Sequence, residues 1–537
     1  MHSKKRLVVA LMVVGWWMSA ASAAQGQSPG PASPAPGRVP APGQPAPGPA
    51  SPANLTRDVW EIAYLDGVRA GFMRFEVTEQ TQGDVRFLRA RQTLDLTLKR
   101  MGGIARVQAE TGSDETADGR VLAVYMRQGL ARDQHLLMTG TVEDRQLRVK
   151  VVGMSNFEKL LPWNPQTIGL IGEQDLLRNR QAKPGDTFDY TIFEPTVTAV
   201  VKVRVQVLPM EEVTVEGQGK RRLMRVEVRP EKIAQVQLPT RLLWVEPQSY
   251  AVIRSEADLP FLGRLVTVRS TAREAKAPVT PTVALDSIQT IRLDQRIARI
   301  HQRKEVTYRV SLTNEADPAS VFAQDARQSV LRVDPRAGTL ELRVRAGEVP
   351  AAANAQPPDS PGQEYLASNY FINSADEMVR QRTAAALAHL TPSQRRDRWA
   401  VALAIESWVH RHMKASVYTE AMATADHVAR TLEGDCTEYA MLMAAMCRAA
   451  EVPARTALGL IYFERNGQPY LAYHMWTEVY VAGKWHGLDA TLGLGRVGPG
   501  HLKVTDHSWH DTRSLTPVLP VLRLMNARPR ISVLASE

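Results

Sequence analysis

The 537-residue sequence predicts an α+β protein in which two β-rich segments precede a segment of mixed helices and strands. Polar and apolar residues alternate through much of residues 56–275 and 283–350, which is the period of a half-buried strand. From about residue 363 the apolar residues recur at helical spacing, and alternation returns near residue 473. The chain is too long for one hydrophobic core, so we expect about three folded domains.

The amino terminus predicts a signal peptide over residues 1–24. Lys4–Arg6 precede an apolar run that ends at Trp17, which is too short for a comfortable membrane span, and Ala21–Ala23 is typical of a cleavage site. Residues 25–55 are rich in proline and predict a disordered linker. We therefore expect an exported protein, periplasmic or secreted, with no transmembrane span after cleavage; an uncleaved anchor is the alternative.

The first β-rich segment contains strongly alternating stretches, with a helical insert expected near residues 172–181. Its clearest predicted strands are 60–77, 92–98, 197–207, 221–228 and 242–255. Residues 283–350 lie between proline-containing stretches and predict a small β-sandwich-like domain. The first of these segments carries no cluster typical of a nucleophile or a metal site.

The net charge of +10 is modest for this length and is scattered along the chain. No basic block with interleaved aromatic residues is present, which argues against a nucleic-acid partner.

Gly434–Ala440 is the most informative stretch of the chain. Asp435 and Glu438 have the spacing of a capping box, which places Cys436 in the first turn of a helix. There the free amides and the helix dipole are expected to lower the pKa of the thiol and to bind an oxyanion. For a cysteine taken alone, the alternative is a small buried core residue.

A histidine and an aspartate follow in matching contexts. His474 lies in the alternating segment 473–481, which predicts a strand, and Ala482-Gly483 predicts a hairpin turn. Asp489 follows the return strand, so the hairpin can place its carboxylate beside the imidazole. A thiol, a base and a group that orients the base are the parts needed for acyl transfer.

Three sequence blocks carry a family resemblance: G-D-C-x-E-x-A from residue 434, H-x-W-x-E-V-Y from 474, and L-D-x-T from 488. They resemble the catalytic core of the transglutaminase-like superfamily, a papain-like fold, as found in exported bacterial members with a β-rich N-terminal region. The resemblance covers roughly residues 366–500, with Met475 and Ala490 in place of the commoner alanine and proline. It implies Cys436 as the nucleophile, His474 as the base and Asp489 as its orienter, without a cofactor.

These features predict a transglutaminase-like catalytic domain over residues 363–500 and a C-terminal extension over 501–537. Thr391-Pro392 predicts the start of a helix that directs Trp399 and Trp408 into the core. Cys447 is interpreted as a structural thiol on the helix of Cys436, too far along it for a disulfide.

His501, His507 and His510 lie near the tail, and we interpret them as solvated loop residues. A metal site at these histidines is the less favoured alternative, so no metal ligand is predicted.

The leading functional hypothesis is an exported thiol enzyme that cleaves or exchanges amide bonds through a thioester on Cys436. Hydrolysis is favoured over cross-linking, and the expected substrate is a protein, a peptide or a cell-wall peptide. One alternative is a non-catalytic cell-envelope protein that binds partners through its β domains. A dedicated protein cross-linker is another.

Overall fold

The computed structural model describes residues 55–100, 103–131, 134–152, 158–233, 237–259, 263–279, 290–313, 315–350, 361–415, 423–510 and 516–537. One compact unit contains residues 55–99 and 104–279, and the other contains the described part of 290–537. The predicted signal peptide and nearly all of the predicted linker lie outside the described residues.

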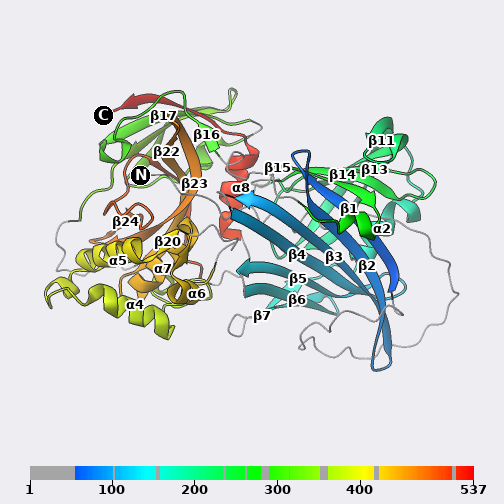
Figure 1. Ribbon diagram of the computed structural model, residues 1–537, viewed down its shortest axis with the longest axis horizontal. Coiled ribbons are helices and arrows are strands. Elements are labelled where there is room, and N and C mark those ends of the chain that lie inside the picture. The colour runs from blue at the N-terminus through cyan, green and yellow to red at the C-terminus, as the bar shows by residue number, and fades with distance from the viewer. Residues whose placement is uncertain are drawn as a thin grey trace. The chain divides into compact units, whose positions relative to one another are not determined.

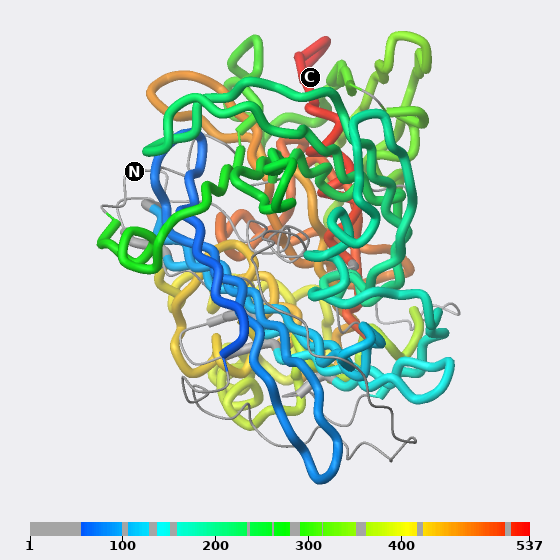
Figure 2. Tube along the Cα trace, turned by 90° about the vertical axis from the view of Figure 1, so that its right-hand side faces the viewer, coloured from blue at the N-terminus to red at the C-terminus, as the bar shows by residue number. Residues whose placement is uncertain are grey.

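The N-terminal unit is built on one fifteen-stranded sheet with the order β8-β7-β6-β5-β4-β3-β2-β1-β15-β14-β13-β12-β11-β10-β9. Figure 2 shows its long β2–β3 hairpin projecting at the bottom in blue. The strands are β1 (Leu55–Leu65), β2 (Val68–Gln82), β3 (Val85–Arg100), β4 (Gly103–Glu115), β5 (Val121–Ala131), β6 (Gln134–Glu143), β7 (Gln146–Val152), β8 (Glu158–Pro162), β9 (Thr167–Ile168), β10 (Thr187–Glu194), β11 (Ala199–Val215), β12 (Gly219–Pro230), β13 (Arg241–Val245), β14 (Val252–Leu259) and β15 (Gly263–Ser270).

Two of the predicted strands are in fact hairpins. Residues 60–77 contain the end of β1 and most of β2, joined at Asp66 and Gly67, whose φ values of 48° and 81° form the turn. Residues 242–255 likewise contain parts of β13 and β14. Alternation continues through the two-residue turn of the first hairpin, and the second hairpin reverses over residues 246–251, so the period alone did not reveal where the chain reverses.

The predicted helical insert is confirmed as α2 (Leu170–Asn179). Its first turn is held by β4, because the backbone N–H groups of Ile171 and Gly172 donate to the Glu115 carboxylate at 2.8 and 3.2 Å. The N–H of Leu170 donates to the Ser113 hydroxyl at 3.0 Å. Buried side chains of β4 thus satisfy helix-terminal donors that would otherwise lack partners.

The second unit contains a mixed core of helices and strands. Its main sheet has the order β16-β23-β22-β25, and β24 pairs with β23 beside β16. Helices α4 to α7 gather on one side of this sheet, with α7 packed against α4, α5 and α6 (Figure 1). The strands are β16 (Thr290–Arg292), β22 (Ala454–Arg465), β23 (Gln468–Val481), β24 (Lys484–Leu488) and β25 (His501–His507), and the helices are α4 (Glu377–Leu387), α5 (Arg398–His412), α6 (Ala425–Thr431), α7 (Cys436–Ala449) and α8 (Leu519–Asn526).

A second sheet of the same unit joins segments from its two ends. Its order is β18 (Gln328–Asp334), β19 (Thr339–Arg345), β17 (Glu305–Ser311) and β26 (Arg530–Ser536). The C-terminal strand β26 therefore completes the sheet begun by the segment that was expected to fold alone. The expected boundaries near residues 350 and 500 do not separate compact units. Long-range strand pairing of this kind leaves no local sequence period.

Helix α5 begins later than predicted. The Asp397 carboxylate accepts from the backbone N–H of Trp399 at 2.9 Å and caps the helix, so the helix starts at Arg398 rather than at Pro392. Thr391 instead closes a turn with Gln394. The predicted burial of Trp399 and Trp408 is confirmed.

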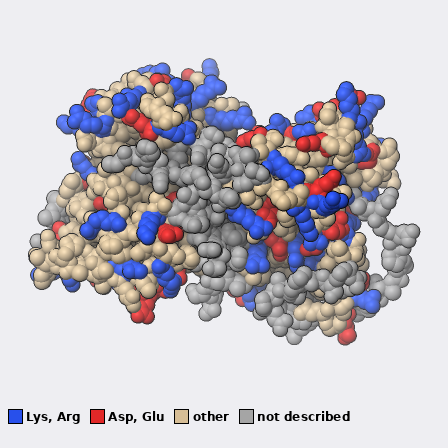
Figure 3. All heavy atoms as spheres, viewed as in Figure 1, with Lys and Arg blue, Asp and Glu red and all other residues tan. Residues whose placement is uncertain are grey.

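On the face drawn in Figure 3, basic and acidic side chains are interspersed over the described residues. None of the helices in the described part of the chain has the length and apolar character needed to cross a bilayer.

Candidate active site

The predicted capping box at the start of α7 is confirmed. The Asp435 carboxylate accepts from the N–H of Thr437 at 3.1 Å, and the Glu438 carboxylate accepts from the N–H of Asp435 at 2.9 Å. Gly434 has a φ of 156°, and a Cβ there would lie 2.3 Å from the Cβ of Glu438. Only glycine therefore fits before this box, and the box fixes Cys436 at the first helical position.

The Cys436 sulfur lies against strand β23. The backbone N–H of Met475 donates to the sulfur, so the thiol is next to the residue that follows His474. β23 pairs with β16 at residues 470–472 and with β24 at residues 477–481. The backbone of residues 473–476 lies between these two pairings, and there it can bond to the start of α7. The Thr477 hydroxyl donates to the Ala440 carbonyl at 3.0 Å and ties α7 to the same strand.

The prediction of a lowered thiol pKa is wrong. Burial raises the pKa of Cys436 well above its ordinary value, and the Asp435 carboxylate raises it further. Removal of water disfavours the thiolate more strongly than the N–H bond from Met475 favours it. The resting site therefore holds a neutral thiol, which needs a base at the moment of attack. Cys447 is also a free buried thiol whose pKa is raised by burial.

The expected contact between His474 and Asp489 is present. Nε2 of His474 lies 2.9 Å from Oδ2 of Asp489, and both side chains are almost fully buried. The contact depends on the β23–β24 hairpin, whose turn residues Ala482 and Gly483 have φ values of 51° and 80°. Because Nε2 faces the carboxylate, Nδ1 is the ring nitrogen left to act as a base.

Thr491 holds the other oxygen of the same carboxylate. Its backbone N–H donates to Oδ1 of Asp489 at 2.9 Å, and its hydroxyl donates to the same atom. These bonds stabilise the ionised carboxylate and fix its plane toward His474.

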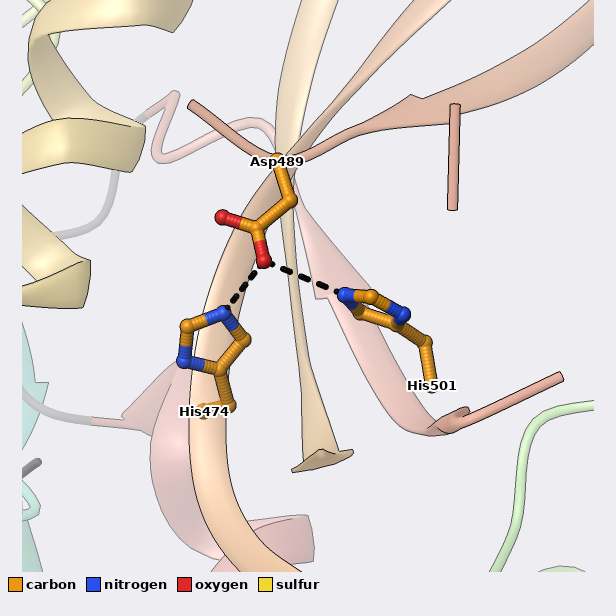
Figure 4. A group of neighbouring side chains, drawn as sticks. All are labelled: His474, Asp489 and His501. Carbon is orange, nitrogen blue, oxygen red and sulfur yellow. Dashed lines mark hydrogen bonds and ion pairs between the residues drawn. The ribbon is translucent and has the colours of Figure 1, made fainter. Parts of the chain in front are cut away.

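Sequence reasoning missed His501, which belongs to this site. It is fully buried at the start of β25, and its Nε2 lies 3.1 Å from Oδ2 of Asp489. Figure 4 shows both imidazoles directed at this one oxygen. The interpretation of His501 as a solvated loop residue is therefore wrong, and it is also wrong for His507, which is half-buried at the end of β25. His510 is exposed. The signal that could have found it is the alternation of Leu502 and Val504 with polar residues, which indicates a strand.

His474, Asp489 and His501 also have the chemistry of a cation site. One ligand atom from each lies within 4.8 Å of the others, and two imidazoles with a carboxylate suit zinc. The same atoms satisfy one another by hydrogen bonds, since each Nε2 lies within hydrogen-bonding distance of the shared oxygen.

A buried glutamate holds the loop that follows Asp489. Glu406 on α5 is 3 % exposed, and its carboxylate accepts from the backbone N–H of Gly495 at 3.0 Å. Burial raises its pKa to about 7, and the nearby charge of Asp489 acts in the same direction.

The Glu406→Gln variant is expected to be more stable than the native protein at pH 8, by about 2–3 kcal/mol. The folded-state pKa of about 7 is above the ordinary value of 4.5, so the stabilising contribution of Glu406 is complete below about pH 4.5 and is lost as the pH rises through 7. Glutamine keeps an acceptor for Gly495 without ionising. Urea unfolding at pH 5 and pH 8 measures the difference. The exposed Glu451→Gln change is the control, and an equal pH dependence in native protein and Glu406→Gln would contradict the expectation.

Comparison with known proteins gives the family of this segment. The family model of the transglutaminase-like superfamily matches residues 385–490, which include the Cys436 helix, the His474 strand and Asp489. Residues 385–490 form a transglutaminase-like domain.

Several known proteins are similar to this chain. Kyphoscoliosis peptidase of Mus musculus is 34% identical over 113 residues, which are 19% of this chain and 17% of that protein. Its human counterpart is 32% identical over 104 residues, or 18% of this chain and 16% of that protein. The chain thus spans about a sixth of the length of these relatives.

Solved structures are also similar to the chain, among them a periplasmic domain. The periplasmic domain of TgpA from Pseudomonas aeruginosa, solved with ethylmercury, is 14% identical with a TM-score of 0.25 and covers 38% of this chain and 89% of that one. A TM-score this low does not extend the transglutaminase-like assignment to the rest of the chain.

Proposed function

We propose that this protein is an exported thiol enzyme that hydrolyses amide bonds through a thioester on Cys436. The observation that carries the proposal is the pairing of two features. The Cys436 sulfur lies against Met475 at the start of a capped helix, and the neighbouring His474 is bonded to Asp489 at 2.9 Å. A buried thiol, an imidazole on the strand that the thiol contacts and an orienting carboxylate are the groups that covalent acyl transfer requires.

The raised pKa of the thiol sets the order of the first step. The sulfur begins as a neutral thiol, and Nδ1 of His474 takes its proton as the sulfur attacks the amide carbonyl. Asp489 stabilises the imidazolium that forms, since its Oδ2 accepts from Nε2. The backbone N–H of Cys436 takes no part in the capping box and is the helix-terminal donor proposed to stabilise the oxyanion.

The second half of the reaction releases the acyl group. The imidazolium gives its proton to the nitrogen of the leaving amine as the C–N bond breaks, and the thioester remains. His474 then takes a proton from water, which attacks the thioester carbonyl and frees the carboxylic acid and the thiol. Water is preferred over an amine acceptor because a relative of the transglutaminase-like domain is named a peptidase.

The substrate class follows from the predicted location. We propose a protein, a peptide or a cell-wall peptide as substrate. The β-rich N-terminal unit contributes no residue to the proposed chemistry. Export is supported by Lys4–Arg6, the short apolar run and Ala21–Ala23. Amino-terminal sequencing of the recovered protein tests it: a start near Ala24 supports export with cleavage, and an intact Met1 opposes it.

A screen of peptides and cell-wall fragments by intact mass tests the reaction. We expect an acyl adduct on Cys436 that decays to a free acid in water, and hydroxylamine should trap the acyl group as a hydroxamate. An adduct that transfers only to amines would indicate cross-linking instead of hydrolysis. Turnover without any adduct on Cys436 would refute the proposed mechanism.

A further inference from the structure

The Asp489 carboxylate has two imidazole partners, although the proposed chemistry uses one. Oδ2 lies 2.9 Å from Nε2 of His474 and 3.1 Å from Nε2 of His501 (Figure 4). We propose that His501 is a positioning residue, which holds the Asp489 carboxylate in the orientation that His474 needs. This inference rests on the proposed function of Cys436 and His474.

The strand order explains how His501 reaches this carboxylate. β22 lies between β23 and β25, and Gly459 of β22 is opposite His474 on one side and Lys503 on the other. Residues that lie opposite one another share a face of the sheet, so His474, Gly459, Lys503 and His501 project from the same face. Because glycine has no side chain, Gly459 places no group of its own between the side chains of the two outer strands on this face.

Two further observations support this crossing. A Cβ on Gly459 would lie 2.0 Å from the carbonyl oxygen of Leu502, so β25 approaches closer than any larger residue allows. Nζ of Lys503 also reaches across β22 and lies 2.9 Å from the Glu478 carboxylate of β23. Side chains of β25 therefore reach over β22 at more than one position of this face, and His501 is one of them.

The imidazole of His501 is held from several sides. The Trp476 ring packs edge-on with centroids 5.3 Å apart, and the His301 ring packs edge-on at 5.6 Å. The backbone of His501 is fixed as well, since Arg327 donates to its carbonyl at 3.0 Å. A ring restrained in this way can restrain the group that it contacts.

His501 acts as a neutral hydrogen-bond donor. Its Nε2 faces a carboxylate oxygen and must carry the proton, while Nδ1 is buried without a hydrogen-bond partner among the described residues. Burial lowers the pKa of His501 to about 3, which agrees with a neutral ring. A neutral donor orients the Asp489 carboxylate and leaves its negative charge available to the His474 imidazolium.

Two substitutions separate the donor from the bulk of the ring. His501→Phe keeps a ring of similar volume without the N–H, and His501→Gln keeps an N–H donor. The matched control is His486→Phe, because His486 is a buried histidine of the same domain whose ring nitrogens lie 3.2 Å from the backbone carbonyls of Glu348 and Val481, away from Asp489 and His474. Thermal unfolding of each variant checks that the fold is retained.

Turnover of a screened amide substrate is the first measurement. We expect His501→Phe to lower kcat by about 10–100-fold with KM within about twofold, as for other partners that orient a reacting group. His501→Gln should recover most of the loss, and His486→Phe should match the native enzyme. Native kcat in His501→Phe, or an equal loss in both His501 variants, would overturn the inference.

Alkylation of Cys436 by iodoacetamide is the second measurement, and it needs no substrate. The alkylation rate of the His474→Ala variant shows the complete loss of assistance by the base. We expect His501→Phe alone to slow alkylation toward that rate. The double variant His474→Ala/His501→Phe should alkylate as fast as His474→Ala. If His474→Ala alkylates as fast as the native protein, the proposed function itself fails. If only His501→Phe has no effect, the positioning role alone fails. Loss of native activity on treatment with a chelator would overturn the hydrogen-bonded arrangement in favour of a metal site.

Discussion

Replacement of Cys436 by alanine is expected to lower kcat by at least about 10⁴-fold, because no other group can form the thioester. The change removes one sulfur from a buried position at the start of α7. The capping box does not involve the Cys436 side chain, since Asp435 and Glu438 bond to backbone N–H groups. The helix and its position against β23 should therefore remain.

The matched control for this variant is Cys447→Ala. Cys447 is a free, fully buried thiol on the same helix, so the two changes remove the same atom from similar surroundings. We expect Cys447→Ala to retain native turnover and acyl-adduct formation, and thermal unfolding to be similar for the two variants. Robust amide cleavage by Cys436→Ala, with Cys447→Ala inactive, would reassign the nucleophile.

The Asp489→Asn variant is expected to lower kcat by about 10³–10⁴-fold. The carboxylate oxygens face four donors: Nε2 of His474, Nε2 of His501, and the N–H and hydroxyl of Thr491. An asparagine has one acceptor oxygen and one NH₂ group, so one pair of donors must face N–H hydrogens. Either His474 loses its hydrogen-bond acceptor or Thr491 no longer holds the side chain at position 489. In both cases the imidazolium of His474 loses the negative charge that stabilises it.

A double-variant comparison tests whether Asp489 acts through His474. His474→Ala/Asp489→Asn should be no less active than His474→Ala alone, because the carboxylate then has no base to orient. A further loss in the double variant would assign Asp489 a separate role. Near-native activity of Asp489→Asn, with the fold intact, would exclude the carboxylate from catalysis.

The sequence by itself determined the local parts of this site. Capping boxes and two-residue turns are set by contacts within a few residues, so the spacing of Asp435 and Glu438 placed Cys436 correctly. The alternation at 473–481 and the Ala482-Gly483 turn likewise predicted the hairpin that brings His474 to Asp489. These elements are local, and the sequence motifs record them directly.

Only the tertiary structure decided the surroundings of those parts. The partnership of His501 with Asp489 depends on the order β23-β22-β25 and on the missing side chain of Gly459, neither of which has a local period. The pairing of β26 with β17 is long-range in the same way. The pKa of Cys436 was predicted in the wrong direction because the helix terminus is visible in the sequence, whereas the depth of burial is not. Removal of water from the thiol is a property of the whole packed domain, and here it is the largest contribution to the raised pKa.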